Sequence, residues 1–242
     1  MISKRPTRRH HASVRAVLGL AAAGLALTGC GSSIGIHPGS AAVIGGDSVS
    51  MDKIDSTSTL YCKAYVTSQQ QSSAQQQSGP VPMGLFRSFV AGSLAKRLLG
   101  EQLADQYDVQ PASGYQSQVS QITSALTSAP ADQRDAVIDV AAADAYLQNV
   151  QVAIGQKLTG NEGQSNADIK AALQRGQVAT QDWLNDHDAF IDPVFSISVD
   201  GGKFSRQQDQ TSYALSTFAA QGSKQQPDQA YTAALPAAQR CG

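Results

Sequence analysis

Regularly spaced apolar residues in the middle of the chain constrain its fold most strongly. One row recurs every fourth residue and a second row lies beside it: Phe86, Val90, Leu94, Leu98, Ala91, Ala95, Leu99 and Leu103. This spacing puts both rows on one side of an α-helix and predicts a helix over residues 85–107 that buries that side. Aromatic residues make up only 6% of the chain, which favours closely packed helices over a large β-sandwich core.

Other segments show the same helical spacing. Ser50 can cap the first of them, and Pro130 stops the second. The third is expected to be the longest, because nothing in its sequence interrupts the apolar pattern. These helices are expected at residues 51–66, 113–129, 132–160 and 166–187.

Strands are predicted at two places. Short apolar stretches flank Gly45-Gly46-Asp47, which predicts a tight hairpin within residues 41–50. Later, Phe195, Ile197 and Val199 alternate with polar residues, as in a half-buried strand. Gly201-Gly202 then predicts a turn, after which the ribbon is expected to continue as Lys203-Phe204. The fold class expected is therefore mainly α with a small β ribbon.

Residues 68–84 differ from the helices around them. They carry two glutamine triplets, followed by Gly79-Pro80 and Pro82, and they show no apolar face. We expect a mobile loop here.

The first residues read as an export signal. Five basic residues precede a run of apolar residues from Ala16 to Leu27, the order of a secretory signal peptide. The run is too short for a membrane-spanning helix, which needs about 20 apolar residues. Residues 1–29 are therefore expected to be a signal peptide, and the Gly- and Ser-rich residues 30–40 a tether.

The end of this leader, Leu27-Thr28-Gly29-Cys30, resembles the lipobox of bacterial lipoproteins. The resemblance implies that Cys30 carries a lipid and that cleavage occurs before it. Several fatty acyl chains on one residue would hold the protein on a membrane, since each buried CH₂ contributes about 0.8 kcal/mol. The expected location is the extracytoplasmic face of the cell membrane.

The remaining cysteines, Cys62 and Cys241, would then lie in a compartment that permits disulfides. A disulfide between them would pin the C-terminal tail, residues 206–242. Two free thiols and a zinc-binding pair are the alternatives, although a structural zinc site usually has four ligands. No other cysteine or histidine pair lies near by in the sequence.

Removing the leader changes the charge of the chain. Residues 1–29 hold five of the 18 basic residues and none of the 19 acidic ones. The rest carries 13 basic and 19 acidic residues, a net charge of −6. Nucleic acid is a poor partner for such a surface.

Four segments match catalytic or metal-binding patterns, and none has the context that the chemistry needs. Gly31-Ser32-Ser33-Ile34-Gly35 lies in the tether, not between a strand and a helix. Ser50-Met51-Asp52-Lys53 and Ser93-Leu94-Ala95-Lys96 match S-x-x-K without the partner motifs of penicillin-recognising enzymes. Asn185-Asp186-His187-Asp188 is interpreted as a solvated helix end. We predict no catalytic residue, no metal site and no cofactor.

The order of elements resembles a known family. A hairpin of the form V-x-G-x-x-[IV]-S, here Val43 to Ser50, leads into a capped helix, and a lone strand, Phe195 to Val199, returns late. This is similar to the N-terminal chaperone domain of SurA and its trigger-factor-like relatives, in lipoprotein form. The resemblance covers residues 41–205. It implies that the late strand pairs beside the hairpin and that unfolded envelope proteins are bound. There is no parvulin domain, so prolyl isomerisation does not carry over.

Two functions are expected from these patterns. The first is a membrane-anchored chaperone-like protein that binds non-native secreted polypeptides without catalysis. The second is a scaffold or accessory lipoprotein that binds one folded envelope partner. A wide apolar groove would favour the first function, and a sealed core under a polar surface would favour the second.

Overall fold

The computed structural model describes residues 37–71, 79–207, 214–222, 224 and 226–242. The predicted signal peptide, Cys30 and the tether up to residue 36 lie outside the described residues. Residues 37–242 form one compact unit. Within the described residues, no helix is both long enough and apolar enough to cross a membrane.

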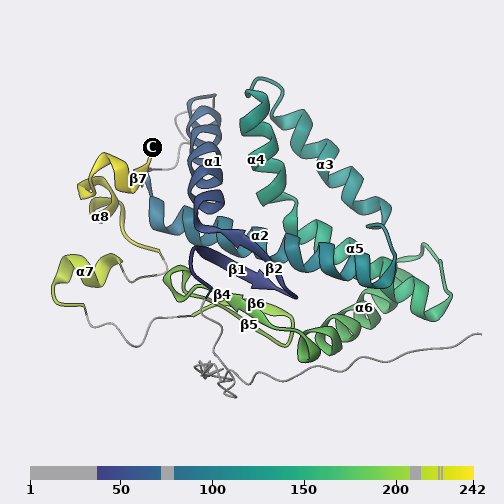
Figure 1. Cartoon of the computed structure of the whole chain (residues 1–242). Helices are drawn as coiled ribbons and strands as arrows, with labels where there is room; N and C mark the ends of the chain where they lie inside the picture. The colour runs from purple at the N-terminus through teal and green to yellow at the C-terminus, as the bar shows by residue number, and fades with distance from the viewer. Residues whose placement is uncertain (1–36, 72–78, 208–213, 223, 225) are drawn as a thin grey trace, which may run out of the picture. The chain divides into compact units, whose positions relative to one another are not determined.

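The unit is mainly helical, which confirms the predicted fold class (Figure 1). Ser50 caps the first helix as predicted, because its Oγ accepts a hydrogen bond from Lys53 N at 3.1 Å. Ser165 does the same for Asp168 N at 3.2 Å. The long helices are α1 (Met51–Gln71), α2 (Met83–Tyr107), α3 (Ser113–Ala125), α4 (Ala131–Ala141), α5 (Ala143–Thr159) and α6 (Asn166–Asp186).

Helix α2 links two hydrophobic clusters, and both apolar rows predicted on it are buried. In the first cluster Leu99 and Leu103 pack with α5 and with Trp183 of α6. In the second, Val90 and Leu94 pack with residues of α1, α4 and the strands. Because the first half of α2 contributes to one cluster and the second half to the other, α2 is the central element of the unit.

The predicted helix over 132–160 is wrong in one respect, because it is two helices. The chain bends at Ala142, whose φ and ψ are −94° and 0°. Helix α4 packs against α1, whereas α5 packs against α2 and α6 (Figure 1). The sequence at the bend, Ala141-Ala142-Ala143, contains no glycine or proline and would suit a continuous helix. The different packing partners of α4 and α5 account for it.

The predicted hairpin is present. β1 (Ser40–Ile44) and β2 (Asp47–Ser50) are antiparallel. Gly45 and Gly46 make the turn at φ +59° and +100°, values that favour glycine. Trp183 occupies the space where Gly45 would carry a side chain, so the turn also sits directly on α6.

The strand beside this hairpin is not the predicted one. β4 (Ala189–Ile191) pairs with β1 and completes a sheet of order β2-β1-β4. Asp192-Pro193 ends β4 and starts the 3₁₀ turn η1 (Pro193–Phe195), in which Asp192 Oδ1 accepts from Val194 N at 2.9 Å. Phe195 is therefore buried in a turn and not in a strand. The expectation that Phe195–Val199 pairs with the hairpin is wrong.

The second half of that segment forms a ribbon of its own. β5 (Ile197–Asp200) pairs with β6 (Lys203–Arg206) in an antiparallel register. The predicted turn at Gly201-Gly202 and the continuation through Lys203-Phe204 are confirmed.

The C-terminal tail returns to the start of the helical unit. It contains α7 (Thr217–Gly222), α8 (Gln229–Ala234), η2 (Ala237–Gln239) and β7 (Arg240–Cys241). β7 pairs with β3 (Val81–Pro82). Cys62 of α1 and Cys241 form a disulfide with an S–S distance of 2.09 Å, so the predicted pairing is present in the structure.

The predicted loop over 68–84 is shorter than expected. Residues 68–71 continue α1, since glutamine is a good helix former. Residues 81–82 form β3 and residues 83–84 begin α2. The pairing with β7 explains the strand, and it depends on a segment about 160 positions away that local sequence does not reveal. Residues 72–78 lie outside the described residues.

Candidate functional site

The β5–β6 ribbon lies against α2 and leaves cavities along its two sides. Its turn is tight because Gly201 and Gly202 both have positive φ, +52° and +78°. Ile197 packs onto α2 at Gly92, where an added Cβ would lie 3.0 Å from Ile197 Cδ1. The absence of a side chain at Gly92 therefore lets the ribbon approach the helix.

Two of the cavities border β6. The first, about 220 Å³, lies between β6 and α2, and the second, about 700 Å³, lies between the ribbon turn, α5 and α6. Lys96 and Phe204 line both, so the cavities adjoin at these residues. We call the combined depression the β6 groove.

The first cavity is the more apolar one. Leu85 and Phe89 of α2 face Ile197 and Phe204 of the ribbon across it. The side chain of Phe89 is 51% exposed, which is unusual for so large an apolar residue in a position that helical spacing could bury.

Phe89 is the outer member of an aromatic cluster between α1 and α2. Its ring centroid lies 5.8 Å from that of Tyr61, which in turn lies 5.7 Å from Phe86. Burial raises the pKa of the Tyr61 hydroxyl above its usual value. Phe89 therefore packs on one side against aromatic rings that α1 and α2 hold in place.

The second cavity has five glutamine side chains in its lining. Its glutamines come from α5 and α6: Gln148, Gln151, Gln174, Gln177 and Gln181. Gln151 is buried and donates to Thr180 Oγ1 at 3.1 Å, which joins the two helices at the cavity floor. Val178, 48% exposed, lies among the amides. A glutamine amide both donates and accepts hydrogen bonds, as a peptide group does.

Charges on the groove are mostly basic. Lys96, Lys203 and Arg206 line it, and Asp144 is its only acidic lining residue among those that the structure describes. Lys96 Nζ lies 2.7 Å from Asp144 Oδ1 and 5.8 Å from the centroid of the Phe204 ring. The groove is thus a basic region of a chain whose net charge is negative.

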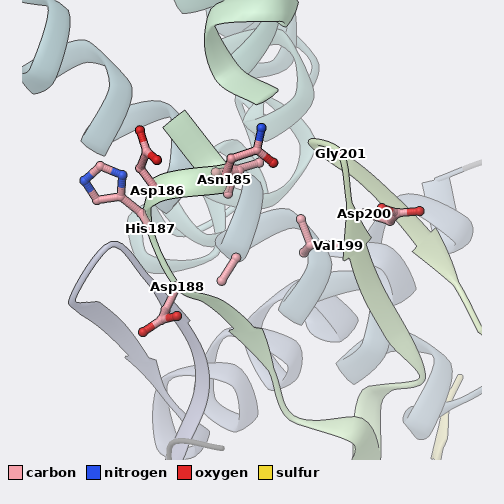
Figure 2. A pocket seen from close by; sticks show the side chains of 9 residues that line it. Asn185, Asp186, His187, Asp188, Val199, Asp200 and Gly201 are labelled. Carbon is pink, nitrogen blue, oxygen red and sulfur yellow. The ribbon is translucent and has the colours of Figure 1, made fainter. Parts of the chain in front are cut away.

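A third cavity, about 370 Å³, lies on the other side of the ribbon and is lined by Asn185 to Asp188 and by Val199 to Gly201. Figure 2 shows that Asp186, Asp188 and Asp200 point in different directions. His187 stacks on Trp183 with ring centroids 4.0 Å apart, and its Nδ1 lies 2.8 Å from Trp183 O. Among the residues that the structure describes, no cluster of side chains could hold a metal ion.

The structure separates the two S-x-x-K matches. Ser50 is a helix cap, as described above. Ser93 and Lys96 both line the first cavity, and Lys96 is engaged by Asp144. The serine-elbow match at residues 31–35 lies outside the described residues, as does Cys30.

Sequence reasoning did not identify the β6 groove. One signal was present, because Gln174, Gln177 and Gln181 recur at spacings of three and four and so share one face of α6. That face becomes a site only because the ribbon folds back onto it. The turn of the ribbon was predicted from Gly201-Gly202, but the position of the ribbon over α2 could not be read from the sequence alone.

Comparison with protein-family models, with curated proteins and with solved structures finds no match to this chain.

Proposed function

We propose that this protein is a chaperone-like lipoprotein, anchored on the extracytoplasmic face of the membrane, that binds non-native secreted polypeptides in the β6 groove. The observation that carries the proposal is the groove itself, in which half-exposed apolar side chains lie beside a row of amides. The resemblance to SurA-type domains points to the same function.

The apolar part supports binding of unfolded chains. Phe89 and Val178 lie at the two ends of the groove and are each about half exposed. Exposed apolar side chains in a depression gain free energy when a partner covers them, by about 25 cal/mol per Å² of apolar surface. Unfolded polypeptides offer such side chains, and most folded proteins bury them.

The amide part supports binding of an extended backbone. An unfolded segment that leaves water must keep its N–H and C=O groups hydrogen-bonded, at a cost of about 1–3 kcal/mol for each unsatisfied group. The glutamines of α5 and α6 can serve either kind of group. Because their side chains are flexible, they suit segments of different sequence.

The alternative, a scaffold for one folded envelope partner, predicts a different result in the same assay. We expect residues 31–242, without lipid, to suppress the aggregation of a chemically unfolded secretory protein at stoichiometric amounts. Light scattering after dilution from guanidinium measures this. No suppression at a twofold molar excess, together with one dominant folded partner in cross-linked pull-downs, would contradict the chaperone proposal.

Membrane anchoring is tested at Cys30. We expect the full chain to sediment with membranes and to incorporate labelled fatty acid. Cys30→Ala should abolish the label and move the protein to the soluble fraction, because the fatty acyl chains expected on the Cys30 sulfur would be missing. Labelling that persists in Cys30→Ala would show that the lipid is elsewhere.

A further inference from the structure

The exposed edge of β6 borders the groove along its length. Phe204 of β6 lines both cavities, and Lys203 and Arg206 line one each. The third cavity borders β5 instead, through Val199 and Asp200. Among the described residues, β6 pairs with β5 and with no other strand. The groove is therefore the space into which a further strand beside β6 would fit.

The register shows how β6 presents its backbone. Gln207 N–H donates to Ser196 O at 2.8 Å, and hydrogen-bonded pairs alternate along an antiparallel ribbon. The pairs Ser198–Ser205 and Asp200–Lys203 are thus the hydrogen-bonded ones. Phe204, which lies between them, turns its N–H and C=O away from β5 and toward the outer edge.

We propose that the β6 groove binds an extended polypeptide segment by strand addition to the edge of β6, and that it selects segments in which acidic side chains alternate with apolar ones. This inference rests on the proposed function and adds the binding mode and the class of segment. Strand addition gives affinity through the backbone, and side-chain pockets give specificity.

Acidic and apolar side chains are expected to alternate in the bound segment because its two faces would meet different surfaces of the protein. Successive side chains of a strand point to opposite faces. A segment beside β6 would place one set over the apolar surface of Phe89, Ile197 and Phe204. The other set would point away from α2, to the face on which Lys203 lies, because Lys203 alternates with Phe204 along β6.

The basic residues of β6 favour an acidic segment over a second copy of β6 as the strand that pairs with this edge. Lys203 at the edge favours acidic side chains on the face of the segment that points away from α2. A second copy of β6 would bring the same basic residues together, and basic residues on edge strands commonly prevent such pairing. An acidic and apolar segment is the occupant that fits both the charge and the pocket.

Fluorescence anisotropy with short labelled peptides tests the inference on residues 31–242. The probe is an eight-residue peptide of alternating leucine and glutamate. Two matched peptides carry lysine in place of glutamate, or N-methyl groups on every second amide. We expect the lysine peptide and the N-methylated peptide each to bind at least tenfold more weakly, and the preference for glutamate to shrink at 1 M salt.

A charge-reversal variant locates the effect. Lys203→Glu should weaken binding of the glutamate peptide at least fivefold, whereas Lys63→Glu, on the exposed face of α1 outside the groove, should leave it unchanged. Equal binding of the glutamate and lysine peptides would overturn the acidic preference, and equal binding of the N-methylated peptide would overturn strand addition. If the glutamate peptide does not bind but aggregation is still suppressed, this inference fails while the proposed function stands.

Discussion

Replacing Cys62 and Cys241 with serine is expected to lower the free energy of unfolding by about 5 kcal/mol, because the disulfide closes a loop spanning 179 positions of the chain. This is the largest single effect that the structure predicts. Guanidinium unfolding of residues 31–242, followed by circular dichroism, measures it. Domains of this size are typically stable by about 5–15 kcal/mol in total.

The double variant should also free the tail. Cys241 is fully buried, and its strand β7 pairs with β3 directly before α2. Amide hydrogen exchange should therefore rise in residues 229–242 and at Val81 more than in α5 and α6. A midpoint of unfolding that is the same for the oxidised wild type and the double variant would contradict this account of the tail.

Gly155→Ala is expected to destabilise the unit by about 3 kcal/mol. Helices α5 and α6 cross so closely that a Cβ at Gly155 would overlap the carbonyl group of Ala172. Gly176 lies in the same way against the backbone of Gln151. The obstacle is backbone, which cannot rotate away as a side chain would, so the helices must move apart. Thermal and denaturant unfolding measure the loss.

Gly84→Ala is the matched control. Gly84 lies in the first turn of α2, is exposed, and has nothing within 4 Å of an added Cβ. Alanine is the better helix former by about 1 kcal/mol, so this variant should be unchanged or slightly more stable. If Gly155→Ala behaved like Gly84→Ala, the close approach of α5 and α6 would not be what the structure describes.

Much of the fold was predictable because it is local. The apolar rows on α2, the cap at Ser50 and the glycine turns at residues 45–46 and 201–202 all follow from short-range physical rules. The errors have long-range causes. The bend at Ala142 depends on which helices α4 and α5 contact, and the partner of β1 depends on where Asp192-Pro193 ends β4.

The site was less predictable than the fold. The disulfide outside the groove followed from cysteine counting, since Cys62 and Cys241 are the two cysteines besides Cys30. The β6 groove did not, because Phe89, Val178 and the glutamines are brought together by tertiary packing alone. Phe89 lies outside the two apolar rows predicted on this helix, and its exposure is visible only in the structure.

Site-specific photo-cross-linking tests the central claim most directly. A benzophenone side chain replaces Phe89 or Val178 in the groove, or Leu158, which is 49% exposed on α5 and does not line the groove. The three positions are matched in exposure and differ in place. We predict that an unfolded secretory protein cross-links from positions 89 and 178 and gives at most a tenth of that yield from position 158. Equal yields from all three positions would contradict binding in the β6 groove.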